Sequence, residues 1–105
     1  MDELLQIMQE LSLPFAYDHF AEGESPEPPF VVYLIPGNNN FAADGIAYYK
    51  INEVHIELYT DKKAPLLEAQ VEAVLDQHGL FYTKTEIWIE SEKLYKVLFI
   101  FDMEA

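Results

Sequence analysis

The sequence has no cysteine and no arginine, and only four of its 105 residues are glycine. Without cysteine the chain can form no disulfide framework, no zinc ribbon and no thiol nucleophile. No apolar run approaches the roughly 20 residues that a membrane-spanning helix needs. The first residues, Met1, Asp2 and Glu3, lack the basic region of a signal peptide. We therefore expect a soluble protein without a visible export signal.

Acidic residues dominate the charge, because 19 aspartates and glutamates stand against six lysines, for a formal net charge of −13. Proteins that grip nucleic-acid phosphates do so with clustered lysine and arginine, so nucleic-acid binding is disfavoured. Disorder is disfavoured as well, since half of the residues are hydrophobic and 14% are aromatic. Two interpretations of the acidity stay open: a merely solvated surface, or a face for a basic partner.

The length predicts a single domain over residues 1–105, because either half alone would be too small to bury a stable core. Its N-terminal part predicts a helix over residues 2–11, ended by Pro14. Residues 21–29, rich in acids and proline, predict an extended connection without regular structure. The β-branched and aromatic run at residues 30–35 predicts a buried strand.

The C-terminal half predicts one helix between strands. Residues 46–60 predict a long strand with a break at Asn52-Glu53, followed by a helix that Asp61 caps and Gly79 ends. Two further strands are expected at residues 80–90 and 94–103. The predicted order is α-β-β-α-β-β, which favours an α+β fold: a four-stranded, mostly antiparallel sheet with two helices packed on one face.

Histidines next to carboxylates are the first candidates for chemistry. His55 lies between Glu53 and Glu57 on one strand face, a pattern that could bind a divalent metal or supply an acid–base pair. Alternation on any polar strand face produces the same pattern, and Asp18-His19 has no third group nearby in sequence. No nucleophile has a base at a recognisable spacing. We therefore predict no catalytic residue, no metal and no cofactor.

Two surface segments are candidates for partner binding. The helix predicted after Asp61 carries an acidic stripe at four-residue spacing, formed by Glu68, Glu72 and Asp76. This stripe is either an ordinary solvated face or a docking surface for a basic partner.

The second segment is the loop NNNFAADG at residues 38–45, which is long for a hairpin turn. Its candidate partner-binding residues are Asn38, Asn39, Asn40, Phe41 and Asp44. The apolar Phe41 either folds back onto its own domain or inserts into a neighbour.

Residues 33–101 resemble small proteins encoded among the head-to-tail joining genes of long-tailed phages and prophages of Gram-positive bacteria. The resemblance lies in the Asn-rich loop before Asp44-Gly45, in HIELYTDKK at residues 55–63, and in the helix that runs into residues 78–80. It implies a tail-terminator or tail-completion protein, a small α+β subunit that forms a ring, commonly a hexamer. Such a ring caps the tail tube and joins it to the head.

The partners that the resemblance implies are further copies of the chain, phage tail-tube proteins and head-connector proteins. The implied location is the bacterial host cytoplasm during assembly, and then the virion. An alternative is an acidic protein-binding inhibitor that mimics DNA, which would need carboxylates in two rows at phosphate-like spacing. The lysines are instead scattered through the candidate surfaces, which disfavours that alternative. The preferred interpretation is the one that the resemblance implies, a structural protein of head–tail joining, either a tail terminator or a minor tail subunit.

Overall fold

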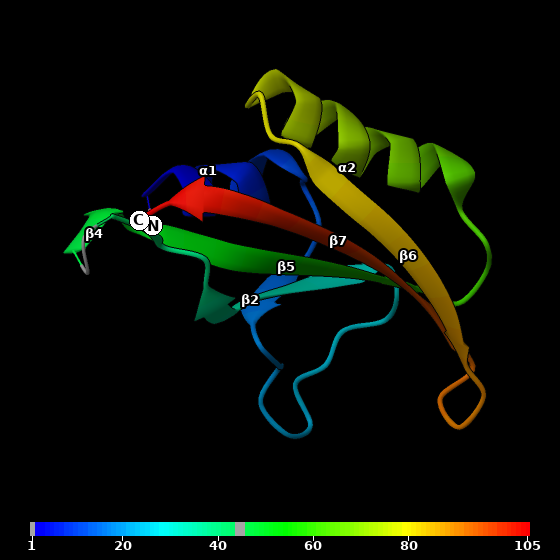
Figure 1. The fold of residues 1–105 in the computed structure, drawn as a ribbon. Coiled ribbons are helices and arrows are strands. Elements are labelled where there is room, and N and C mark those ends of the chain that lie inside the picture. Colours follow the sequence, from blue (N-terminus) through cyan, green and yellow to red (C-terminus); the bar gives the residue numbers. More distant parts are fainter. Residues whose placement is uncertain (1, 44–45) are drawn as a thin grey trace.

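The computed structural model describes residues 2–43 and 46–105, which form two helices and seven strands (Figure 1). In chain order the elements are α1 (Asp2–Glu10), β1 (Phe15–Tyr17), β2 (Phe30–Asn38), β3 (Phe41–Ala43), β4 (Ile46–Tyr49), β5 (Ile51–Thr60), α2 (Pro65–Gln77), β6 (Tyr82–Ile89) and β7 (Leu94–Glu104). The predicted α+β class is confirmed. Within the described ranges, no helix is both long and apolar enough to cross a membrane.

The main sheet has five strands in the order β1-β2-β5-β7-β6, and β3 and β4 form a separate two-stranded sheet. Strand β1 runs parallel to β2, whereas the other neighbours in the main sheet are antiparallel. The predicted four-stranded sheet is therefore wrong in strand number and order. The missing strand, β1, has only three residues, too few for periodicity to reveal. Backbone hydrogen bonds at both ends attach β1 to β2. The Val31 amide donates to the Pro14 carbonyl at 2.9 Å, and the Asp18 amide donates to the Tyr33 carbonyl at 2.8 Å.

The segment after β2 also differs from the prediction. Strand β2 continues to Asn38, and the following residues Phe41–Ala43 form β3 rather than an irregular loop. The predicted turn residues Asp44 and Gly45 lie outside the described part of the chain. The predicted strand 46–60 is two strands that separate at Lys50, two residues before the break expected at Asn52.

Both helices lie on the same side of the main sheet (Figure 1). The core between them and the sheet takes alternate residues of the central strands, as a half-covered sheet requires. On β5 the buried hydrophobic residues are Val54, Ile56 and Leu58, and on β7 they are Val97, Phe99, Phe101 and Met103. Each helix adds an apolar stripe. The stripe of α1 consists of Leu4, Ile7 and Met8, and Leu11 continues it just after the helix.

Helix α2 ends as predicted but starts by different means from its predicted cap. Pro65 occupies the start, but the cap residue is Ala64, without a side-chain hydrogen bond, so the predicted cap at Asp61 is wrong. The end agrees with the prediction because Gly79 has a φ of +68°. The amides of Gly79 and Leu80 donate to the carbonyls of Asp76 and Leu75, at 3.0 and 3.1 Å, the hydrogen bonds of a Schellman motif.

Helix α2 offers a matched test of this packing, because two of its leucines differ in burial and share the same helical context. Leu75 is fully buried, whereas Leu66 is 83% exposed. We expect Leu75→Ala to lower the free energy of unfolding by about 2–5 kcal/mol, through lost apolar contacts and a residual cavity. Leu66→Ala should change it by no more than about 0.5 kcal/mol. Urea denaturation of both variants measures the difference, and equal effects would contradict the assigned helix face.

Candidate partner-binding site

The sheet face opposite the helices carries a mixed polar and apolar surface. The register aligns four side chains across it, one from each of four neighbouring strands: Val32, Glu57, Leu98 and Thr85. On this face the residues of β5 are half-buried, as are Leu94, Lys96, Leu98 and Ile100 of β7, whereas Asp102 and Glu104 of β7 are exposed. No helix lies against this side of the sheet in Figure 1, so its half-buried apolar side chains are available to a partner.

Residues 18–29 lie on this face, on the side of the sheet away from the helices (Figure 1). They account for two buried residues of β2, Phe30 at 9% and Val32 at 3% exposure, which lie outside the main core cluster. Phe20 packs edge-on against Phe30, with ring centroids 5.4 Å apart. As predicted, residues 21–29 contain no helix or strand, but they build a second small aromatic cluster with the sheet.

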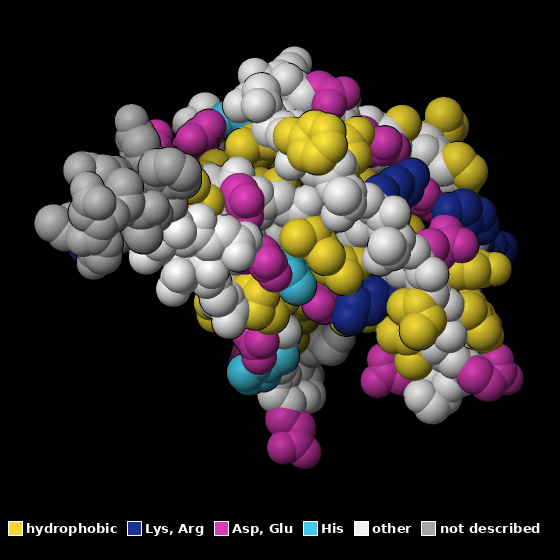
Figure 2. All heavy atoms as spheres, viewed as in Figure 1, with side chains coloured by type: hydrophobic (Ala, Val, Ile, Leu, Met, Phe, Trp, Pro, Cys, Tyr) yellow, Lys and Arg dark blue, Asp and Glu magenta, His cyan; other side chains and the backbone are white. Residues whose placement is uncertain are grey.

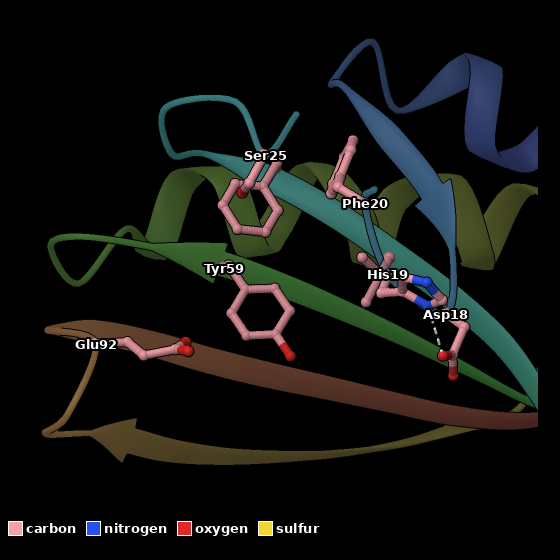
Figure 3. Close-up of a pocket in the computed structure, with 8 residues that line it drawn as sticks. Asp18, His19, Phe20, Ser25, Tyr59 and Glu92 are labelled. Atoms are coloured by element: carbon pink, nitrogen blue, oxygen red, sulfur yellow. Dashed lines mark hydrogen bonds and ion pairs between the residues drawn. The ribbon is translucent and has the colours of Figure 1, made fainter. Parts of the chain in front are cut away.

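A hollow of about 210 Å³ opens beside this cluster (Figure 3). It is lined by Asp18, His19, Phe20, Ser25, Phe30, Val32, Tyr59 and Glu92. The rings of Phe30 and Tyr59 stack with centroids 5.2 Å apart and an interplanar angle of 22°. Glu92 comes from the turn between β6 and β7, and its carboxylate extends toward Tyr59 (Figure 3). Figure 2 shows the corresponding notch in the surface, between the segment below the sheet and the β6–β7 hairpin.

A hydrogen-bond chain fixes Tyr59 at the hollow. Its hydroxyl donates to Glu57 Oε1 at 2.7 Å, and Lys96 Nζ lies 3.2 Å from the other oxygen of the same carboxylate. Burial, together with the hydrogen bond to the Glu57 carboxylate, raises the pKa of Tyr59 well above its usual value. The ring therefore stays neutral at physiological pH and presents an aromatic surface without phenolate charge.

The composition of the hollow favours a cationic guest. Aromatic faces attract ammonium and guanidinium groups through the ring quadrupole, most strongly where water is partly excluded. Phe20, Phe30 and Tyr59 supply the rings, and Asp18 and Glu92 add carboxylates. A lysine or arginine side chain of a protein partner has the chemistry to fit this site.

Asp18, His19 and Ser25 share the hollow and are the residue types of a hydrolytic triad. His19 Nδ1 lies 2.9 Å from Asp18 Oδ2, but this pair is largely exposed. Figure 3 places Ser25 apart from His19, so the nucleophile–base contact that such a triad requires is missing from this arrangement.

The predicted cluster around His55 is divided between two partners. His55 Nε2 contacts Glu53 Oε2 at 2.8 Å, whereas Glu57 is turned toward Tyr59 and Lys96. No group of three or more metal-binding side chains occurs among the residues that the structure describes.

The asparagines of the predicted loop contact the chain itself. Asn39 Nδ2 donates to Asp102 Oδ1 at 2.8 Å and to Glu53 Oε1 at 3.3 Å, and Asn40 Oδ1 accepts from the Ile51 amide at 2.9 Å. They tie the end of β2 to β5 and β7 while staying exposed. The side chain of Phe41, like Asp44, lies outside the described residues, so its role as an anchor stays a prediction.

The predicted solvent-facing acidic stripe on α2 is wrong at its first member. Glu68 is only 3% exposed, and it contacts Lys63 Nζ at 2.6 Å and Lys84 Nζ at 2.9 Å. Glu72 accepts hydrogen bonds from the Tyr82 hydroxyl and Lys84, at 2.9 and 3.2 Å. Strand β6, which carries Tyr82 and Lys84, covers this side of the helix, so only Asp76 remains openly exposed.

Burial acts to raise the pKa of Glu68, but hydrogen bonds from Lys63 and Lys84 outweigh it and leave the pKa lowered. We expect Lys63→Met/Lys84→Met to cost about 3–5 kcal/mol of unfolding free energy at neutral pH, because a buried carboxylate is left unpaired. Glu68→Met should cost less, since the remaining lysines are 45% and 34% exposed and can hydrate. Denaturant unfolding of both variants tests the asymmetry, and a larger loss for Glu68→Met would contradict it.

His78 joins the end of α2 to α1. Its Nδ1 contacts Glu3 at 3.0 Å and its Nε2 contacts Glu10 at 2.9 Å. Hydrogen bonds to Glu10 and then to Glu3 raise the pKa of His78 above its usual 6.5. His78 therefore clamps the two helices together.

The raised pKa of His78 predicts a pH-dependent contribution to stability. Because the folded state binds the proton more tightly, the stabilisation is fully present below about pH 6.5 and is lost as pH rises through the folded-state pKa. The stability difference between the wild type and His78→Gln should thus be larger at about pH 5.5 than at about pH 9. Glu3→Gln/Glu10→Gln should abolish that pH dependence, and a difference constant across pH would rule out the charged clamp.

Comparison with known proteins adds no family to this geometry. A scan against protein-family models finds no match to the chain. A search of the curated proteins finds none either. The features that bear on function are therefore the hollow, the open sheet face and the charge.

Proposed function

We propose that the chain is a structural assembly protein that binds a basic segment of a protein partner in the aromatic hollow. In this proposal it serves in the head–tail joining of a long-tailed phage or prophage, as a tail terminator or a minor tail subunit. Its partners are further copies in a ring, together with tail-tube and head-connector proteins. The proposal for this biological setting rests on the sequence resemblance alone.

The observation that carries the binding role is the combination of rings and carboxylates in one hollow. Three aromatic side chains and two carboxylates line it, and the one nearby lysine of β7, Lys96, is held by Glu57. A cationic side chain entering the hollow gains attraction from the rings and the carboxylates together. The half-buried side chains of the adjoining sheet face extend the contact beyond a single residue.

The charge of the chain supports a basic partner in a second way. Each copy in a ring brings a formal charge of −13, so assembly without counter-charge is opposed by repulsion and should strengthen with salt. A basic partner supplies the missing positive charge and speeds the encounter by electrostatic steering. Ring formation and partner binding are then favoured together.

The proposal predicts the effect of removing the two carboxylates of the hollow. Asp18→Asn/Glu92→Gln should weaken binding to the partner by about tenfold or more, equivalent to about 1.4 kcal/mol. The matched control is Asp61→Asn/Glu104→Gln, which removes the same charge from exposed positions that do not line the hollow. Binding to purified tails and heads is measured by co-sedimentation at two salt concentrations.

Deleting the coding sequence from the phage or prophage that carries it tests the biological role separately. Heads and tails should then accumulate unjoined in electron micrographs. Normally joined particles after deletion would overturn the head–tail proposal. If deletion leaves heads and tails unjoined but both double variants restore joining equally well, the assembly role stands and the hollow is not the binding site.

A further inference from the structure

Strand β6 forms one border of the main sheet and pairs only with β7 among the described strands (Figure 1). It runs for eight residues, Tyr82–Ile89, without a register shift. Residues 83–88 are all exposed, with Ile87 at 58% and Trp88 at 41%. The outer backbone edge of such a strand carries amides and carbonyls that can pair with another strand.

The usual protection of an edge strand is weak here. Native edges are blunted by proline, bulges, short length or outward-pointing lysines. β6 has no proline and no bulge, and its one lysine, Lys84, is drawn to Glu68 and Glu72 of α2. Its one acid, Glu86, pairs with Lys63. In a chain of formal charge −13, β6 is thus a strand of zero net charge with a high β-propensity.

The sequence YTKTEIWI is complementary to itself when two copies run antiparallel around Thr85. In that register Lys84 of each copy lies opposite Glu86 of the other, and Tyr82 lies opposite Trp88. Opposite-charge and aromatic pairs are the cross-strand contacts that stabilise antiparallel sheets. Centring the pair on Lys84 or on Glu86 would instead set like charges against each other.

Flanking residues extend the same match. Phe81, which is 88% exposed, lies opposite Ile89 of the other copy, and Thr83 lies opposite Ile87. Each pair joins residues of the same sheet face, because opposed residues of an antiparallel pair point to the same side. The two sheets become continuous, and their helices stay together on one face.

We propose that β6 is a self-association edge, through which two copies of this chain form an antiparallel, two-fold symmetric dimer centred on Thr85. Such a contact is isologous and closes at two copies. It is therefore distinct from a ring, and it is independent of the cation-binding hollow. The contact area of one strand pair places it among weak associations, and salt should strengthen it by screening the acidic surfaces of the two copies.

The absence of cysteine from the natural sequence permits a direct test of the register. Opposed residues of antiparallel strands have Cα atoms about 4.5–5.5 Å apart, within the range that a disulfide spans. Thr85→Cys should therefore form an inter-chain disulfide readily when the folded protein is mildly oxidised, as seen on non-reducing gels.

Thr83→Cys is the matched control, since it changes the same residue type on the same face of the same strand. Residue 83 of the partner lies four residues along the strand from the position opposite Thr83, roughly 14 Å away at about 3.4 Å per residue. We expect slow cross-linking from Thr83→Cys and fast cross-linking from Thr83→Cys/Ile87→Cys, which restores an opposed pair. Equal rates for Thr83→Cys and Thr85→Cys, or no disulfide from either, would overturn the proposal.

A second measurement avoids engineered cysteines. The mass of the wild-type protein by light scattering should rise from 12.2 kDa toward twice that value with protein concentration and salt. Thr85→Lys places two like charges at the two-fold centre and should stay monomeric, with an unchanged circular dichroism spectrum. A wild-type protein that stays monomeric at millimolar concentration in high salt overturns self-pairing and leaves the edge to a strand of another protein. If the protein instead forms ring-sized particles and Thr85→Cys does not cross-link them, the β6 dimer is overturned and the ring is favoured.

Discussion

The ten-residue antiparallel pairing of β5 with β7 is the contact on which the rest of the structure depends. It runs from Ile51 against Glu104 to Thr60 against Tyr95 without a register shift. Because side chains alternate across a strand, this one register sends Ile56 and Phe99 into the core and sends Glu57 and Leu98 to the opposite face. A slip of one residue would exchange the two faces, and both the core and the candidate site would be lost.

Three of the lysines in the described ion pairs neutralise buried or half-buried carboxylates, whereas Lys93 pairs with the exposed Glu90. Lys63 and Lys84 form ion pairs with Glu68 of α2, and Lys96 forms one with Glu57, which also binds the Tyr59 hydroxyl. This placement leaves the charge of β6 locally balanced, while Asp18 and Glu92 line the hollow. Local charge therefore separates two kinds of surface: an edge that tolerates a second copy, and a hollow that attracts a cation.

The elements that could be predicted from the sequence are those whose signal is local and repeated. Alternation identified β5, the apolar run at residues 94–103 identified β7, and helical spacing identified α1. β1 could not be predicted because three residues carry no periodicity. The burial of Glu68 was missed for a related reason. Its four-residue spacing from Glu72 predicts that both lie on one helix face, but it does not predict which strand covers that face. Only the fold brings Lys84 across from β6 to pair with it.

The candidate hollow lay beyond sequence reasoning because its parts come from distant segments. Phe20 belongs to a segment without regular structure, Tyr59 ends β5, and Glu92 lies in the β6–β7 turn. None has a pattern of its own, and their convergence depends on how residues 18–29 fold against β2.

The hollow lies against β2 and β5 and reaches the β6–β7 turn, whereas the proposed pairing uses the outer edge of β6. The proposed pairing uses β6 up to Ile89, whereas Glu92 lies beyond it in the turn to β7. A copy bound at β6 thus leaves the ring stack of Phe30 and Tyr59 open on the β2 side. Because β5 and β7 connect β2 to β6 through backbone pairing, one sheet can hold a second copy at its β6 border and a basic partner segment against β2 and β5.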